Sequence, residues 1–180
     1  MKIIPSIGRW LLPITCAAAA TVAAAQEIKF GYNGDLSASP AAASGQAAVL
    51  GMQAAIEDIN AAGGLLGRKI SLVIRDDVAQ PPKALQNTNE LIDREKVVAM
   101  FGPTNSGNGL AWKHIPNQKK VPVMGIVGGA TDLTKPTGTD ADNYMFRVSM
   151  VDRYQVAALM AWAKKSGEVK AARYHRHAHA

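Results

Sequence analysis

A glycine-rich turn, GPTNSGNGLAW (Gly102–Trp112), offers the clearest candidate chemistry in the chain. It follows the apolar run VVAMF and leads into a predicted helix. Asn108 and Gly109 stand where a Walker phosphate loop needs Lys and then Ser or Thr, so the cation that would meet the phosphates is missing. Trp112 stands where a dinucleotide fingerprint needs a small residue, and its ring would block close helix–strand packing. We therefore expect no nucleotide site in this turn.

Three loops that follow predicted strands share a small, polar composition. They are NGDLSASPAAASG, the turn GPTNSGNG and the segment GGATDLT. Ligands of open parallel sheets bind in loops of this kind, at the carboxyl ends of the strands. Small residues let the backbone approach a ligand, and hydroxyls with free amides at a helix start favour a negative group. The loops therefore predict a reversible binding site for a small molecule that carries a carboxylate.

The residues that could support catalysis lack the partners that catalysis needs. Ser106 does not lie in a G-x-S-x-G nucleophile elbow. His114 is the only histidine outside the C-terminal tail, and it has no evident triad partners. Because it lies in a predicted helix beside Lys113, we expect it on the surface. The sequence therefore predicts no enzyme and no cofactor.

Two groups of residues resemble metal sites. Asp76 and Asp77 end a predicted strand, where neighbouring side chains point to opposite faces. We expect one of these carboxylates to cap or turn the chain and the other to be solvated. His175, His177 and His179 alternate near the C-terminus, where a polar tail that gathers metal only adventitiously is the simpler interpretation. We expect no functional metal site.

The first 25 residues have the pattern of a secretory signal. Lys2 and Arg9 make its start positive, WLLPITCAAAATV supplies a short apolar core, and AAA supplies a small-residue cleavage site. The apolar run is too short to span a bilayer. We expect cleavage after Ala25, export to the periplasm and no stable membrane insertion afterwards. Cys16, the only cysteine, leaves a lipoprotein anchor as an alternative, although PITC lacks the usual Leu three residues before the Cys.

The net charge of +6 says little about partners, because it gathers at the two ends of the chain. Residues 1–25 and residues 168–180 each contribute +2, which leaves +2 for the long central part, where the signs are mixed. There is no basic stripe with interleaved aromatic residues. We therefore expect no nucleic-acid partner.

From residue 26 onward, apolar strands alternate with helical segments, which is typical of an α/β domain with a parallel sheet and helices on both faces. The predicted strands are residues 28–33, 69–77, 97–101, 121–127 and 143–149. The predicted helices are residues 44–64, 81–96, 106–119 and 152–167. Apolar stripes predict the buried faces of the first two helices: Val49, Met52, Ile56 and Ile59, and then Leu85, Thr88, Leu91 and Ile92.

Several segments resemble, in order and spacing, the N-terminal lobe of the periplasmic substrate-binding proteins of branched-chain amino-acid ABC transporters. The most specific is GMQAAIEDINAAGGLLGRKI, which lies inside a longer match from Gly31 to Asp77. FGPTNSGNGLA, VPVMGIVGGATDLT and MFRVSMVDRYQ follow. The resemblance covers residues 28–167. It implies a Rossmann-like parallel sheet with helices on both faces, the first of two lobes that close on an amino acid around a hinge.

The resemblance also implies which residues hold the ligand. In this family the first lobe binds the main-chain carboxylate and ammonium groups of the amino acid. That role falls on the glycine-rich turn, on the loop after the fourth strand and, less strongly, on the first loop: Ser106, Asn105, Gly129, Ala130, Thr131 and Ser44. A hydroxyl with helix-start amides suits a carboxylate, whereas carbonyls with the Thr131 hydroxyl suit an ammonium. The alternative is that Ser106 and Thr131 only cap their helices.

The implied order along the chain is a signal peptide (1–25), a ligand-binding lobe (26–150), a crossover helix (151–167) and an aberrant disordered tail (168–180). We expect the second lobe to be missing, which would expose Val156, Leu159 and Met160 on the crossover helix. The implied function is capture of an amino acid, branched-chain by resemblance, for the permease subunits of an ABC importer. The alternative is a ligand-sensing domain of the same fold that controls a partner protein.

Overall fold

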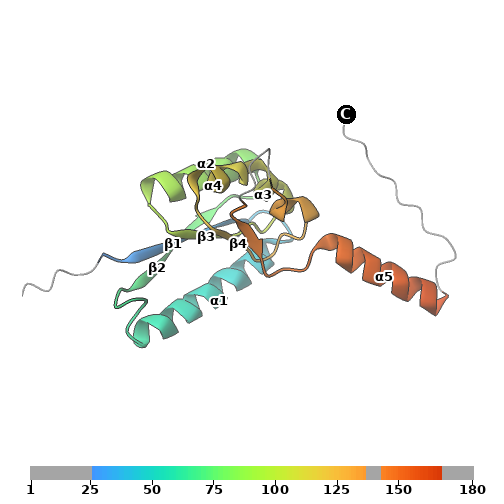
Figure 1. Cartoon of the computed structure of the whole chain (residues 1–180), viewed down its shortest axis with the longest axis horizontal. Helices are drawn as coiled ribbons and strands as arrows, with labels where there is room; N and C mark the ends of the chain where they lie inside the picture. The colour runs from blue at the N-terminus through green and yellow to red at the C-terminus, as the bar shows by residue number, and fades with distance from the viewer. Residues whose placement is uncertain (1–25, 137–142, 168–180) are drawn as a thin grey trace, which may run out of the picture.

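A computed structural model describes residues 26–136 and 143–167 of the chain. Its centre is a parallel sheet with the strand order β2-β1-β3-β4-β5 (Figure 1). The strands are β1 (Ile28–Gly34), β2 (Ile70–Asp76), β3 (Ala99–Phe101), β4 (Val123–Gly125) and β5 (Met145–Arg147). The parallel α/β sheet expected from the sequence is confirmed. The calls on residues 1–25 and 168–180 lie outside the described residues.

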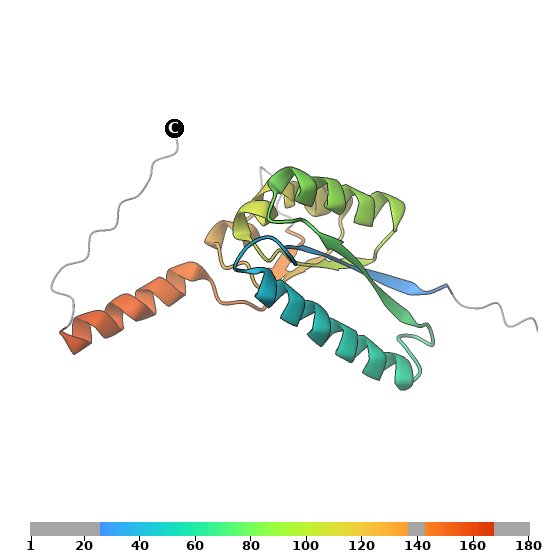
Figure 2. The ribbon, with the colours of Figure 1, turned by 180° about the vertical axis from the view of Figure 1, so that it is seen from behind.

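Helices cover both faces of the sheet unequally (Figures 1 and 2). One face carries α2 (Pro81–Asn89), α3 (Ser106–Trp112) and α4 (His114–Lys119). Of the described helices, only α1 (Ala42–Ala61) covers the opposite face. A π-helical turn, η1 (Glu90–Arg94), extends α2, and a 3-10 turn, η2 (Thr131–Thr134), follows β4. The last helix, α5 (Asp152–Ser166), leaves the body of the domain and points away from it.

The predicted helix that reaches Lys119 is divided into α3 and α4. Pro116 explains the division, because it has no N–H to donate to the Trp112 carbonyl four residues earlier. The end of α1 follows its prediction more closely. Gly63 and Gly64 have positive φ angles of 105° and 81°, a conformation that glycine adopts without strain.

The main core lies under the better-covered face. It consists of side chains from β3, β4 and β5, from the helices α2 to α4, from η1 and from the segment before β3: Ala84, Leu91, Ile92, Val97, Met100, Trp112, Ile115, Val123 and Met145. Thr88, Leu91 and Ile92 are buried as predicted, but Leu85 is 36% exposed, so the predicted stripe is one residue too wide. A polar contact also joins α2 to the sheet: Asn33 Nδ2 on β1 donates a hydrogen bond to the Ala84 carbonyl at 2.7 Å.

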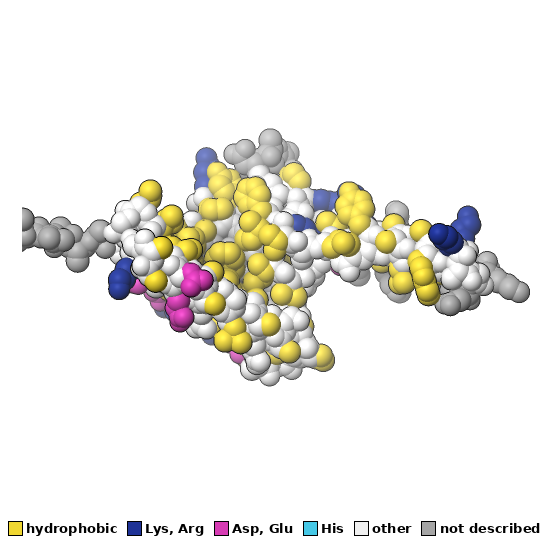
Figure 3. Space-filling model, turned by 90° about the horizontal axis from the view of Figure 1, so that it is seen from below, with side chains coloured by type: hydrophobic (Ala, Val, Ile, Leu, Met, Phe, Trp, Pro, Cys, Tyr) yellow, Lys and Arg dark blue, Asp and Glu magenta, His cyan; other side chains and the backbone are white. Residues whose placement is uncertain are grey.

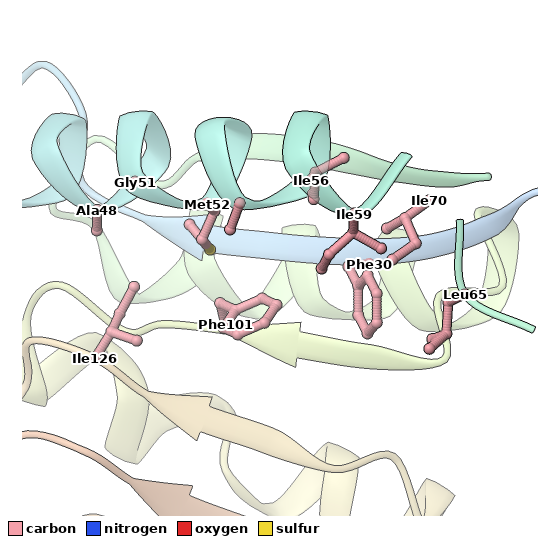
Figure 4. A pocket seen from close by; sticks show the side chains of 11 residues that line it. Phe30, Ala48, Gly51, Met52, Ile56, Ile59, Leu65, Ile70, Phe101 and Ile126 are labelled. Carbon is pink, nitrogen blue, oxygen red and sulfur yellow. The ribbon is translucent and has the colours of Figure 1, made fainter. Parts of the chain in front are cut away.

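The opposite face differs from its prediction. The α1 stripe was expected to be buried, yet Val49, Met52 and Ile56 are only half-buried and Ile59 is 40% exposed. Three of its residues, Met52, Ile56 and Ile59, instead lie in one wall of an open hollow of about 580 Å³, here called the α1 groove (Figure 4). The rest of its lining includes Phe30, Leu65, Phe101 and Ile126. The sheet supplies the other wall. A single helix is too narrow to cover this face of the sheet.

The crossover helix matches its prediction. Val156, Leu159 and Met160 are 51%, 61% and 41% exposed. The N–H of Asp152 donates to the Gly129 carbonyl at 2.9 Å, which fixes the start of α5 to the loop after β4. A glycine at position 129 leaves room for Asp152, because a Cβ there would collide with the Asp152 carboxylate. Within the described residues, no helix combines the length and hydrophobicity needed to cross a bilayer.

Candidate binding site at the carboxyl edge of the sheet

The glycine-rich turn after β3 and the loop after β4 meet at the carboxyl edge of the sheet. Neighbouring parallel strands end at the same edge, so the two loops start side by side. The N–H of Gly128 donates to the Pro103 carbonyl at 3.1 Å, and the N–H of Ala130 donates to Ser106 Oγ at 3.1 Å. Two loops that are 24 residues apart in sequence are therefore joined through Ser106.

Four of the six predicted ligand-binding residues gather at this junction. Ser106 is the first residue of α3, Gly129 and Ala130 precede η2, and Thr131 begins it. All four are half-buried, which leaves them partly open to solvent. The Ser106 side chain does not cap its own helix, since its oxygen takes the Ala130 N–H instead. Thr131 makes no side-chain cap for η2 either.

The other two predicted residues direct their side chains elsewhere or lie on another element. Asn105 precedes α3, and its Nδ2 faces an Asp35 oxygen at 3.5 Å, the outer limit of a hydrogen bond. Ser44 lies in the first turn of α1 with its side chain exposed. Both border the first loop rather than the Ser106–Ala130 contact.

Arg147, at the end of β5, donates two hydrogen bonds to the loop after β4. Its Nη1 donates to the Gly129 carbonyl at 3.1 Å and its Nη2 to the Ala130 carbonyl at 2.6 Å. These are two of the carbonyls that the resemblance assigns to an ammonium group. The guanidinium therefore places positive charge beside the predicted site. Only the position of Arg147 in the MFRVS strand could have pointed to this role.

Lys113 holds the other end of the same loop. It is 5% exposed, and its Nζ donates to the carbonyls of Asp132 and Lys135 at 2.5 and 2.8 Å. Burial lowers the pKa of Lys113 below its ordinary value. His114, the next residue, is exposed as predicted. Sequence reasoning missed Lys113 because a lysine next to an exposed histidine in a helix normally points to solvent.

The paired aspartates behave differently from their prediction. Asp76 does turn the chain, since its carboxylate accepts from the Leu36 N–H at 3.0 Å and from Ser37 Oγ at 2.6 Å. The other aspartate of the pair was expected to be solvated, and this is wrong, because Asp77 is fully buried. The chain turns at Val78, with a φ of 46°, directly after β2, and this turn directs the Asp77 carboxylate into the interior. Burial raises the pKa of Asp77.

Asp35 joins this pair, and the carboxylates of Asp35, Asp76 and Asp77 offer oxygens within 4.8 Å of one another. Burial raises the pKa of Asp35, but hydrogen bonds from Ser39 and from the N–H groups of residues 37–39 outweigh it and lower the pKa to about 2. The oxygens of Asp35 and Asp76 are therefore already held by donors of the first loop. These carboxylates are therefore better suited to fixing the conformation of the first loop than to binding a metal ion.

Comparison with known proteins places these features in context. A family model described as "Periplasmic binding protein" matches residues 27–175. An amino acid binding protein from Pseudomonas aeruginosa is 36% identical over 106 residues, which cover 58% of this chain and 27% of that protein. The chain spans less than a third of the length of the curated relatives that it matches first.

Solved structures agree with the fold. The leucine-binding protein LivK from Thermotoga maritima aligns with a TM-score of 0.70 at 26% identity, over 79% of this chain and 38% of that one. The branched-chain amino acid transporter substrate-binding protein LivJ from Streptococcus pneumoniae, solved with isoleucine, aligns with a TM-score of 0.63 at 31% identity. That alignment covers 71% of this chain and 35% of that protein.

Proposed function

The chain belongs to the periplasmic binding protein family, and on that premise we propose that it binds the α-carboxylate of an amino acid at the junction of Ser106 with Ala130 and Thr131. The amino acid that fits the proposal best is a branched-chain one, because the relative solved with isoleucine carries the same fold. The chain acts by reversible binding without turnover. It operates in the periplasm and hands its ligand to the permease of an ABC importer.

The contact between Ser106 Oγ and the Ala130 N–H carries this proposal. It joins Ser106, the first residue of α3, to Ala130, which directly precedes Thr131, and all three residues are half-buried. This supports a shared set of hydroxyl and amide donors at the carboxyl edge of the sheet. A carboxylate accepts hydrogen bonds and donates none, so it suits this set of donors. Arg147 and Lys113 add positive charge behind the loop.

Calorimetric titration with L-leucine and with its amide, leucinamide, tests the proposal. The two ligands share a side chain and an ammonium group but differ in the carboxylate. We expect the chain to bind leucine and to bind leucinamide at least tenfold more weakly, because a hydrogen bond to a charged group contributes about 1.5–3 kcal/mol. Equal binding of the two, or no binding of either, would contradict a carboxylate site.

Substitution of Ser106 tests whether leucine binds at the proposed junction. Ser106→Ala removes one hydroxyl, and we expect leucine affinity to fall by about tenfold or more. The matched control is Ser166→Ala at the end of α5, where the hydroxyl donates only to the Ala163 carbonyl within the described residues. That variant should bind leucine like the unmodified chain. If Ser106→Ala leaves affinity unchanged while the unmodified chain binds leucine, the site lies elsewhere.

A further inference from the structure

Asp77 is a buried carboxyl group that the proposed site does not use. Figure 3 shows acidic and basic side chains on the surface of the face that carries α1. Asp77 differs from them, because it lies directly after β2 and is fully buried. Its Oδ1 accepts a hydrogen bond from the Ala79 N–H at 3.0 Å, whereas its Oδ2 has no partner within the described residues. A buried polar atom without a partner costs free energy, so it calls for an explanation.

Two more carboxylates lie beside this group. Oxygens of Asp35, Asp76 and Asp77 lie within 4.8 Å of one another. Burial alone would raise the pKa values of Asp35 and Asp76, but hydrogen bonds from the first loop outweigh it and lower both. Asp77 lacks such a set of donors and meets two negative charges. Its carboxyl group therefore keeps its proton to a higher pH than its two neighbours do.

The other charged or titratable groups near Asp77 do not offset this. Tyr32, on β1, is neutral, because burial raises its pKa above the ordinary 10.0. Lys83 is the only charged residue of α2, and its charge acts on Glu90. The helix α3 carries no charged residue. Asp77 is therefore the group of this cluster whose charge changes as the pH rises above 3.8.

Asn108, on α3, connects Asp77 to the helix that carries Ser106. It is 3% exposed, and its Nδ2 has no partner within the described residues. Burial raises the pKa of Asp77, and the Asn108 side chain opposes this shift, so the two groups act on each other. An ionised Asp77 accepts a hydrogen bond from such an amide, whereas a protonated Asp77 has an O–H of its own to donate. The two forms of Asp77 therefore hold α3 differently.

The helix α3 depends on contacts of this kind. It has seven residues, of which Gly107 and Gly109 are poor helix formers, and no side chain caps its start. Its position is therefore decided by its buried side, where Asn108 and Trp112 lie four residues apart. Asn108 follows Ser106 by two residues, so a movement of α3 at Asn108 also moves Ser106.

We propose that Asp77 is a positioning residue for the binding site, where the presence or absence of its proton sets, through Asn108, how α3 holds Ser106. This inference rests on the proposed function, in which Ser106 binds the ligand. The neutral form of Asp77 favours leucine. The cluster adjoins the glycine-rich turn through the Thr104 and Asn105 contacts to Asp35, and an ionised Asp77 adds negative charge where the ligand brings its own.

Nuclear magnetic resonance tests the link to α3 without a ligand. The Asp77 carboxyl carbon and the backbone amides of Ser106 and Asn108 are followed on the unmodified chain from about pH 3 to about pH 7. We expect the three signals to change with one midpoint, above the ordinary 3.8. In Asp77→Asn the two amides should no longer change with that midpoint. A midpoint at or below 3.8, or a Ser106 amide that does not follow Asp77, overturns the proposal.

Calorimetric titration with L-leucine over the same range tests the effect on binding. From about pH 4 to about pH 7 leucine keeps one carboxylate and one ammonium group. We expect affinity to be highest while Asp77 is protonated and to fall by about fivefold or more as the pH rises through its pKa. Linkage is reciprocal, so saturating leucine should raise the midpoint of Asp77 by about 0.7 pH unit for a fivefold change.

Asp77→Asn distinguishes positioning from a purely structural role, because asparagine is neutral at every pH and has nearly the same shape. It should bind leucine near pH 7 at least as tightly as the unmodified chain, without the fall in affinity. Asp58→Asn, exposed on α1, is the matched control and should keep the fall. A fall that persists in Asp77→Asn overturns the proposal, and so does weaker binding at every pH.

The two measurements also separate this proposal from the proposed function. If the unmodified chain binds leucine at no pH, the proposed function fails. The resonance midpoints of Asp77, Asn108 and Ser106 then still decide whether the proton of Asp77 sets the position of α3.

Discussion

At the scale of single residues, the positive charge at the candidate site comes from two side chains that donate hydrogen bonds to carbonyls of the loop after β4. Arg147 and Lys113 each donate two hydrogen bonds to carbonyls of the loop after β4. Arg147 binds the loop near its start and Lys113 binds it near its end. The loop is thereby fixed between two cations. Fixed positive charge close to a small anion favours its binding even without direct contact. In the proposed site, these two residues would position the loop rather than touch the ligand.

Arg147→Met tests this positioning role. We expect leucine affinity to fall by about tenfold, with part of it restored in Arg147→Lys, which keeps the charge but loses the two-pronged geometry. A purely structural role would weaken leucine and leucinamide equally. A role in carboxylate recognition predicts that Arg147→Met loses the preference for leucine and that Arg147→Lys keeps part of it. Arg94→Met, an exposed arginine on η1, serves as the control and should bind both ligands normally.

Asp35 gives a prediction for pH dependence. Its pKa is about 2 in the folded chain against an ordinary 3.8, because the donors of the first loop stabilise its charged form. The resulting stability, about 2 kcal/mol, is present above pH 3.8 and is lost as the pH falls towards 2. Asp35→Asn should therefore lower the free energy of unfolding by about that amount near pH 7. Urea unfolding at several pH values should show the difference shrinking below pH 3.8.

Asp77 should show the opposite trend. Because burial raises its pKa, its contribution to stability is present below the ordinary value of 3.8 and is lost as the pH rises through the raised pKa. Asp77→Asn, which is neutral at every pH, should cost less stability near pH 7 than Asp35→Asn does. Asp58→Asn, at an exposed position on α1, should change nothing. A larger loss for Asp77→Asn than for Asp35→Asn near pH 7 would contradict this assignment of the two carboxylates.

At the scale of elements, the sequence was a good guide wherever one residue type dictates a local conformation. The alternation of strands and helices predicted the parallel sheet, and the predicted end of the first helix at residue 64 lies close to the observed end at Ala61, just before Gly63 and Gly64. The stripe on α1 was misjudged because its apolar periodicity does not reveal how much of the sheet one helix covers. The division at Pro116 was missed although proline gives a direct signal for it.

The candidate site shows the same limit. The residue types and the family resemblance predicted that Ser106 and Thr131 would matter, and the parallel strands bring their loops together. Asp77, Lys113 and Arg147 were misjudged or missed because their roles depend on which way each side chain points across a turn or a strand end. Charged residues usually point to solvent, so the burial of Asp77 and Lys113 and the hydrogen bonds of the half-buried Arg147 are exceptions that only three-dimensional contacts reveal.

At the scale of the whole molecule, the core and the last helix should contribute unequally to stability. The core lies between the sheet and the helices α2 to α4, where large side chains such as Trp112 and Met100 are fully buried. By contrast, α5 exposes most of its large apolar side chains and is held to the domain at its start. Unfolding of the described domain should therefore be governed by the core.

Ending the chain before Gln155 tests this division, because it removes nearly all of α5 and keeps the Asp152 N–H that bonds to Gly129. The free energy of unfolding, measured by urea denaturation, should change by less than about 1 kcal/mol, as for surface changes that remove no core contact. A large loss of stability would instead mean that α5 packs against its own domain and belongs to its folded core.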